Sequence, residues 1–307
     1  MKDFKFILFF LSFNFVVIPA FSIDSMLNLN REVLYIGEPL TLFFSARTFP
    51  EKLNQYKISL DGNNMYENNP LSKLFIKNQV IKNDMISHEI LIYFNSNGDF
   101  IFDHAGKYKV TLQHENAIID KVIQVKPLPD NEKDAFLDYE FLRKEKLLLT
   151  FMSDEWDKGA YNQAKDYLRK HPSSLYSKLP AIYYANMSLK MSNANMFREQ
   201  GLKIGNKVDI NAIMKYKMSV IDKNLKLLSN YDFNSDGFIQ ELADMAILRN
   251  KVAMISASHK MPDEKQLEEI NKLLGKIQDE SSFKQHLEET AEIKNMLQQL
   301  NVEDEDF

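Results

Sequence analysis

The chain has 307 residues and a mass of 35.9 kDa, which is more than one hydrophobic core usually serves, so about two domains are expected. Hydrophobic residues make up 45% and charged residues 26%, and these globular values exclude a wholly disordered chain. The net charge of −5 argues against a dedicated nucleic-acid binder. The lack of cysteine excludes disulfides, thiolate metal sites, cysteine nucleophiles and lipid attachment at cysteine.

The first 22 residues have the composition of a signal peptide. Lys2 and Lys5 are followed by an apolar run over residues 6–18 and by small residues near Ser22. The alternative is a membrane anchor, but an apolar core of about thirteen residues is shorter than the ~20 that span a bilayer. We expect cleavage near Ser22 and a mature chain without a transmembrane segment. Export without cysteine favours a bacterial envelope, with the protein in the periplasm or outside the cell.

Residues 23–128 have the pattern of a β-rich domain. Short apolar runs alternate with turns that contain Gly, Asn, Asp and Pro, and this spacing predicts an antiparallel β-sandwich. The predicted strands are Glu32–Ile36, Leu40–Ala46, Tyr56–Leu60, Leu74–Ile76, Glu89–Phe94, Tyr108–Gln113 and Ile118–Val125.

Two short motifs in this region resemble exported bacterial immunoglobulin-like modules. In the first, Tyr35–Leu42, a Gly-Glu-Pro turn precedes a strand. In the second, Phe102–Val110, the Gly-x-Tyr-x-Val pattern places Tyr108 where such modules have a tyrosine corner. The resemblance covers about a third of the chain, and it implies an immunoglobulin-like sandwich without indicating a ligand.

Residues 129–307 have a helical pattern. Pro127 and Pro129 end the strand region, because proline cannot donate to a β-ladder, and Asp130 or Asn131 is predicted to cap the first helix. Apolar residues then recur at spacings of three and four, which predicts seven or eight helices. Breaks are expected at Pro172, at residues 201–205, at residues 232–237 and at Pro262.

The segment Tyr161–Ala185 resembles a junction between tetratricopeptide-like repeats. Ala164 would allow close helix packing, while Pro172 and Ser174 would end one helix and cap the next. A second copy at the same period is not evident, so the helices are expected to form either a short solenoid or a bundle. Grooves between such helices typically bind peptides or partner helices, which indicates an envelope protein or peptide as the partner.

One loop has the pattern of a cation site. Asp232, Asn234 and Asp236 alternate before a glycine, as in the first half of an EF-hand calcium loop, and Phe238 would contribute its backbone carbonyl. The last ligand position is Ala243, so Glu241 or Asp244 would have to replace the missing bidentate carboxylate. The cofactor expectation is therefore none or weakly bound calcium. The alternative is an ordinary turn and helix cap.

The sequence nominates no catalytic residue. It has no phosphate-binding glycine loop, no zinc-protease motif and no nucleophile elbow, and Trp156 is predicted to pack in a helical core. The first functional hypothesis is an exported, non-enzymatic binding or scaffold protein that acts through its helical domain. One alternative is an envelope enzyme with an active site between the domains. The other is a calcium-stabilised adhesion or matrix component.

Overall fold

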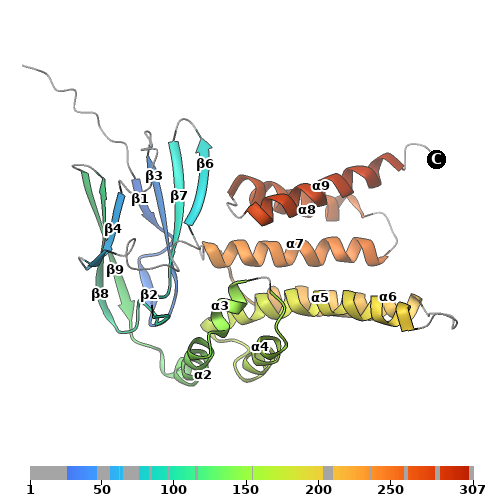
Figure 1. The fold of residues 1–307 in the computed structure, drawn as a ribbon, viewed down its shortest axis with the longest axis horizontal. Helices are drawn as coiled ribbons and strands as arrows, with labels where there is room; N and C mark the ends of the chain where they lie inside the picture. Colours follow the sequence, from blue (N-terminus) through green and yellow to red (C-terminus); the bar gives the residue numbers. More distant parts are fainter. Residues whose placement is uncertain are drawn as a thin grey trace, which may run out of the picture.

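The computed structural model describes residues 26–46, 56–61, 63–64, 76–82, 85–95, 97–114, 117–153, 155–202, 210–234, 237–258, 262–280 and 284–303. The predicted signal peptide lies outside these residues. Strands come first and helices follow, so the protein is a mixed β and α structure with a helical C-terminal region (Figure 1).

The described strands form two small sheets. One has the order β1-β3-β7-β6 and the other β2-β9-β8-β4-β5, and β2 runs parallel to β9. Side chains of both sheets meet in one buried cluster that includes Leu34, Leu42, Leu112 and Ile123. The strands are β1 Met26–Leu29, β2 Val33–Tyr35, β3 Leu40–Ala46, β4 Tyr56–Leu60, β5 Asn63–Asn64, β6 Ile76–Lys82, β7 Met85–Ile92, β8 Gly106–His114 and β9 Ala117–Lys126.

The helices pack mainly against their neighbours in sequence. Helix α7 lies in the middle, with α5 and α6 along one side and α8 and α9 along the other (Figure 1). Among the described residues, no helix is both long and apolar enough to cross a membrane. The helices are η3 Asp130–Glu132, α2 Lys133–Lys144, α3 Leu147–Met152, α4 Lys158–Lys170, η4 Leu175–Ser177, α5 Lys178–Leu202, α6 Ile210–Leu228, α7 Phe238–Ser258, α8 Glu264–Glu280 and α9 Lys284–Glu303.

The largest buried cluster joins the strand region to the helices. Tyr93 and Phe94, just after β7, and Phe100 in the following turn are buried together with side chains of α2, α4, α5 and α7. Phe100 stacks on Tyr139 of α2 with ring centroids 6.0 Å apart. The residues that follow β7 therefore belong to the helical core, whereas Ile92, the last residue of β7, lies in the core between the sheets.

The resemblance to immunoglobulin-like and tetratricopeptide-like families is wrong. Helices make up most of the described structure, the sheets are small, and no immunoglobulin-like sandwich is evident. In an immunoglobulin module the core lies between the two sheets alone, whereas here the larger buried cluster, which includes Phe100, lies against helices. The local contact predicted for Tyr108 is present, because its hydroxyl donates to the carbonyl of His104 at 3.0 Å, but this contact does not establish the family.

Two further predictions need correction. Trp156 lies in the loop before α4 and is 46% exposed, so it is not part of the helical core. Neither Asp130 nor Asn131 caps the first helix through its side chain, because a short η3 turn precedes α2. The cap predicted for Ser174 is confirmed, since its hydroxyl accepts a hydrogen bond from the backbone N–H of Tyr176 at 3.2 Å.

Candidate functional site

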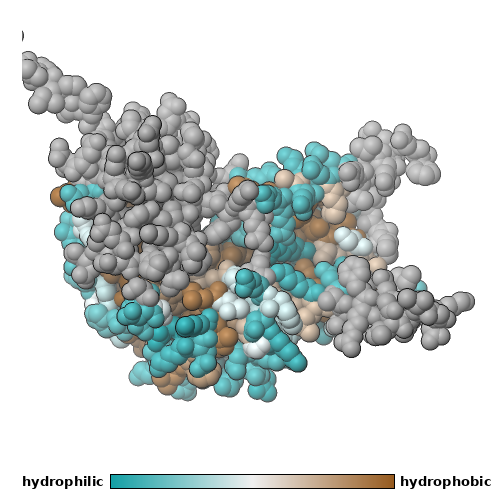
Figure 2. Space-filling model, viewed as in Figure 1, coloured by the Kyte–Doolittle hydropathy of each residue, from teal (hydrophilic) through white to brown (hydrophobic). Residues whose placement is uncertain are grey.

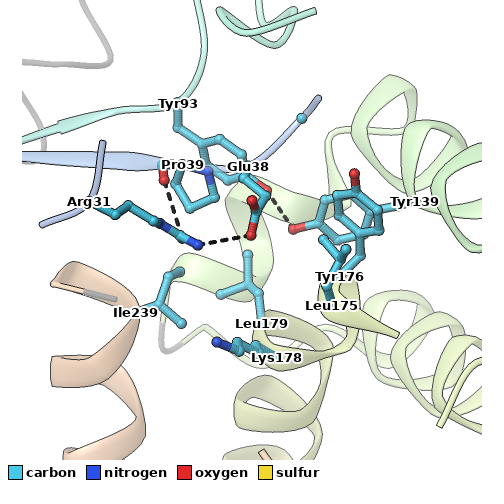
Figure 3. A pocket seen from close by; sticks show the side chains of 11 residues that line it. Arg31, Glu38, Pro39, Tyr93, Tyr139, Leu175, Tyr176, Lys178, Leu179 and Ile239 are labelled. Atoms are coloured by element: carbon cyan, nitrogen blue, oxygen red, sulfur yellow. Dashed lines mark hydrogen bonds and ion pairs between the residues drawn. The ribbon is translucent and has the colours of Figure 1, made fainter. Parts of the chain in front are cut away.

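A pocket lies where the strand region meets the helices. Its cavity volume is about 30 Å³, which is enough for one or two water molecules. The turn between β2 and β3 forms one wall, and side chains from α2, η4, α5 and α7 form the others (Figure 3). The lining residues are Arg31, Gly37, Glu38, Pro39, Tyr93, Tyr139, Leu175, Tyr176, Lys178, Leu179 and Ile239.

Glu38 holds the turn that forms the first wall. Its Oε2 accepts a hydrogen bond from the backbone N–H of Tyr35 at 2.7 Å, and its Oε1 forms an ion pair with Arg31 at 3.0 Å. Gly37 has a φ of +76°, and its N–H donates to the carbonyl of Phe102 at 2.8 Å. The Gly-Glu-Pro sequence therefore places the Glu38 carboxylate beside the Arg31 guanidinium on the lining of the pocket (Figure 3).

Three tyrosines form the deeper wall. The hydroxyls of Tyr93 and Tyr139 hydrogen-bond to each other at 2.5 Å, and the hydroxyl of Tyr176 donates to the carbonyl of Ile36. Burial is the main cause that raises the pKa of all three phenols above the ordinary value. They stay protonated near neutral pH, so they hold the two regions together by hydrogen bonds and do not serve as bases.

The pocket is suited to binding a small polar group. Arg31 and Lys178 place two cationic groups on its lining, while its one carboxylate, Glu38, already pairs with Arg31. Leu175, Leu179 and Ile239 supply apolar contact. A cavity of this size with polar and apolar lining fits one small polar group and is too small for a larger ligand.

The structure places the predicted cation-loop residues in different roles. Asp232 Oδ1 accepts a hydrogen bond from the backbone N–H of Asn234 at 3.0 Å, which is a local turn contact. Asp236 lies outside the described residues. Phe238 begins α7 and is buried, and its N–H points to Thr41 Oγ1 at 3.4 Å.

Glu241 and Asp244 hold helices together. Glu241 Oε1 lies 2.9 Å from Nδ1 of His286 on α9, and Asp244 Oδ2 pairs with Lys276 of α8 at 2.6 Å. Burial is the larger cause that raises the pKa of Asp244, and the pair with Lys276 offsets part of the rise. Among the described residues, no group of three or more His, Asp or Glu side chains is arranged to hold a metal ion.

Sequence reasoning missed the pocket because its walls come from distant segments. The Gly-Glu-Pro sequence predicts a turn, but nothing in the spacing of Tyr93, Tyr139 and Tyr176 indicates that their hydroxyls lie at one junction. These tyrosines occupy apolar positions of the strand and helix patterns. No family model matches the chain, and no curated protein matches its sequence.

Proposed function

We propose that the protein is an exported, non-enzymatic binding protein of the bacterial cell envelope and that its helical region binds a protein partner. The export part rests on the signal-peptide pattern of residues 1–22 and on the absence of cysteine. The binding part rests on one surface feature of α2.

That feature is a pair of exposed apolar side chains. Leu137 is 62% exposed and Phe141 is 50% exposed, and they lie one turn apart on one face of α2. The opposite face of the helix is buried through Ala135, Tyr139 and Leu142, so the exposed face is held rigidly. Hydrophobic residues reach the surface where α2 lies in Figure 2. Large apolar side chains on a rigid helix face are typical of the centre of a protein interface.

The finer architecture is part of the proposal. We infer that α4 to α9 stack as a short solenoid, because each helix packs mainly on its neighbours in sequence. The helices differ in length, from 13 residues in α4 to 25 in α5, so the stack is not an array of equal repeats. In this arrangement α2 lies beside the start of the stack and presents Leu137 and Phe141 outward.

In-cell photo-crosslinking tests the partner. A photo-reactive phenylalanine analogue replaces Phe141 in the full-length tagged chain, and crosslinked species are recovered from the envelope and identified by mass spectrometry. We expect one recurrent partner that is lost in Leu137→Asp. The matched control carries the analogue at Ile118, which is 64% exposed on β9 and outside the helical region. The same species from both positions, or none from Phe141, contradicts the proposal.

The alternative hypothesis is an enzyme with an active site between the two regions, and the pocket lies at that place. If Phe141 gives no crosslinked partner, the junction pocket becomes the place to search for a small substrate. Glu38→Gln is the first variant to make, since Glu38 is the one carboxylate among the lining residues.

The calcium hypothesis has a separate test. We expect the melting temperature of the chain to be the same in millimolar calcium and in chelator, because Glu241 and Asp244 already pair with His286 and Lys276. Asp232→Ala should then leave the calcium response unchanged. A calcium-dependent rise in melting temperature that Asp232→Ala abolishes would support the adhesion or matrix alternative.

A further inference from the structure

Four aromatic residues and one serine form a cluster on the helical region that the proposed function does not use. Trp156 comes from the loop before α4, Tyr161 from α4, Tyr184 and Ser188 from α5, and Tyr216 from α6. We call this set the aromatic platform. It lies in the helical region and shares no residue with the pocket between the strand region and the helices.

Three rings of the aromatic platform, those of Trp156, Tyr161 and Tyr184, contact one another in a row. Tyr161 and Tyr184 stack with centroids 5.1 Å apart and planes 14° from parallel, and Trp156 packs on Tyr161 at 5.6 Å. The hydroxyl of Tyr161 lies 3.4 Å from Oγ of Ser188. Burial raises the pKa of Tyr161, and the nearby hydroxyls of Tyr184 and Tyr216 raise it further. Tyr216 lies on α6, which packs along α5, within electrostatic reach of the Tyr161 hydroxyl.

Two rings of the aromatic platform are exposed. Trp156, at one end of the row, is 46% exposed and Tyr216 is 54% exposed, whereas Tyr161 and Tyr184 are half-buried. Exposing aromatic rings forgoes the hydrophobic free energy that their burial would supply. Most aromatic side chains of the described helices are buried in the core, so these two exposed rings require a separate explanation.

The fold holds Trp156 in its exposed position. The hydroxyl of Tyr183 donates to the carbonyl of Glu155 at 3.1 Å and accepts from the N–H of Asp157 at 3.2 Å. Asp157 also caps α4, because its Oδ1 accepts from the N–H of Ala160 at 2.6 Å. The backbone on both sides of Trp156 is thus fixed while the indole remains at the surface, which is the preorganisation expected of a binding residue.

The chemistry of the aromatic platform selects the class of ligand. Its five side chains are uncharged. They offer ring faces and three phenol hydroxyls, while the Ser188 hydroxyl is buried beside that of Tyr161. A pyranose ring presents an apolar C–H face, which suits the negative face of an aromatic ring, and a rim of hydroxyls that donate and accept hydrogen bonds. Helical backbone has no free edge to which an extended peptide can add. A charged ligand would find no opposite charge among the five side chains.

We propose that the aromatic platform binds a neutral glycan, with sugar rings packed on Trp156 and Tyr216 and their hydroxyls bonded near the hydroxyl of Tyr161. This goes beyond the protein partner proposed for α2, and neither proposal depends on the other.

The single tryptophan makes the test direct. The chain from residue 23 to its end, without the predicted signal peptide, is titrated with chitohexaose, cellohexaose and maltohexaose. The fluorescence of Trp156 is recorded. We expect at least one hexasaccharide to give a saturable change at millimolar concentration or below. Tyr216→Ala should weaken that binding by about tenfold or more. Phe141→Ala is the matched control, since it removes an exposed aromatic ring outside the aromatic platform and should leave glycan affinity unchanged.

Calorimetry with Trp156→Ala provides a readout that does not depend on fluorescence, and it should show the same loss of affinity. No response to any of the three hexasaccharides overturns the proposal. Equal affinity in the parent and in Tyr216→Ala also overturns it, as does a response to a proline decamer in place of the sugars, because proline-rich peptides also dock on aromatic surfaces. If Phe141 still crosslinks its partner in the Tyr216→Ala variant, then the protein-binding surface of α2 and the glycan site are independent of each other.

Discussion

Two glycines with positive φ lie where the strand region contacts the helices. Gly37 has a φ of +76°, and a Cβ placed on it would lie 2.5 Å from Cε2 of Phe136 on α2. Gly237, before α7, has a φ of +54°, and a Cβ there would lie 2.3 Å from Oγ1 of Thr41 on β3. Each glycine lets a backbone segment approach a side chain of the other region. The glycine that resembled the sixth position of a calcium loop thus has a packing role.

Gly37→Ala is predicted to destabilise the protein by roughly 2–5 kcal/mol, because left-handed backbone and overpacking both oppose a methyl group there. Urea unfolding measures the loss. Gly98→Ala is the matched control: its φ is +83°, but nothing lies within 4 Å of the added Cβ. It should cost only the backbone part, roughly 1–2 kcal/mol. Equal losses of unfolding free energy in the two variants would mean that the contact with Phe136 adds nothing to the cost of Gly37→Ala.

Asp244 carries a pH prediction. Burial raises its pKa above the ordinary 3.8, so the native state binds this proton more tightly than the unfolded chain. The stability it contributes is fully present below pH 3.8 and is lost as the pH rises through the folded pKa. The free energy of unfolding of the parent chain minus that of Asp244→Asn should therefore be larger at about pH 4 than at about pH 7. Urea titrations at the two pH values measure this difference.

Asp120→Asn is the control of opposite sign. Hydrogen bonds from Lys109 and Thr111 lower the pKa of Asp120, so its contribution is present above the unfolded pKa and is lost as the pH falls. The effect should be small because the group is exposed. If both aspartates respond in the same direction, then burial is not the dominant influence on Asp244.

At the scale of elements, a buried asparagine pair joins three helices. Nδ2 of Asn224 on α6 donates to the carbonyl of Ala185 on α5 and to Oδ1 of Asn250 on α7, both at 3.0 Å. Nδ2 of Asn250 donates to the carbonyl of Ala246 at 2.8 Å. Both asparagines are almost fully buried, so each depends on the other to satisfy its polar atoms.

Asn250→Ala is predicted to cost about 1–3 kcal/mol, because it leaves Asn224 with an unsatisfied buried donor. Asn224→Ala together with Asn250→Ala should cost less than the sum of the single changes, by at least about 0.5 kcal/mol. A double-mutant cycle in urea measures this coupling. Ser229→Ala, at the exposed end of α6, should change stability by less than about 0.5 kcal/mol. Additive losses would contradict a shared polar network.

Element positions were largely predictable where one periodicity dominated. The strands predicted at Leu40–Ala46 and Tyr56–Leu60 match β3 and β4, and the breaks predicted near Pro172 and Pro262 separate helices. β1 and β5 were missed because they are short, and their strand character depends on pairing with β3 and β4. The break between α2 and α3 was missed as well, since Lys146 adopts a φ of +58° within a continuous apolar pattern. At β1, at β5 and at the break between α2 and α3, tertiary packing determines the secondary structure.

The candidate sites were less predictable than the elements. The cation loop was selected because Asp, Asn and Gly alternate there, yet Glu241 and Asp244 pair with helices that are distant in the sequence. The helical pattern around Trp156 predicts a core position, but Tyr183 hydrogen-bonds to the backbone of its neighbours, Glu155 and Asp157, and the indole stays at the surface. Such contacts link residues 26 to 45 positions apart, and short-range spacing carries no information on them.

At the scale of the molecule, the two sequence-defined regions share a core. Arg143 of α2 binds the turn that contains Phe100. It donates to the carbonyl of Gly98 at 3.1 Å and pairs with Asp99 at 2.6 Å, and its guanidinium lies over the Phe100 ring. Tyr176 and Tyr139 bind the strand region from the other side of the junction. A boundary near residue 128 therefore separates two patterns of secondary structure, and we expect it not to separate two units of folding.

Leu112→Ala tests this coupling across the junction. Leu112 lies in the core between the sheets, and its truncation should cost about 2–5 kcal/mol. Trp156 is the single tryptophan and lies in the helical region, so its fluorescence reports helical unfolding. Because Phe100 and the tyrosines join the two cores, the urea midpoint of Trp156 fluorescence should fall together with hydrogen-exchange protection of β8 and β9. Two independent domains would give the opposite result, with the sheets losing protection while the Trp156 transition stayed at the midpoint of the parent chain.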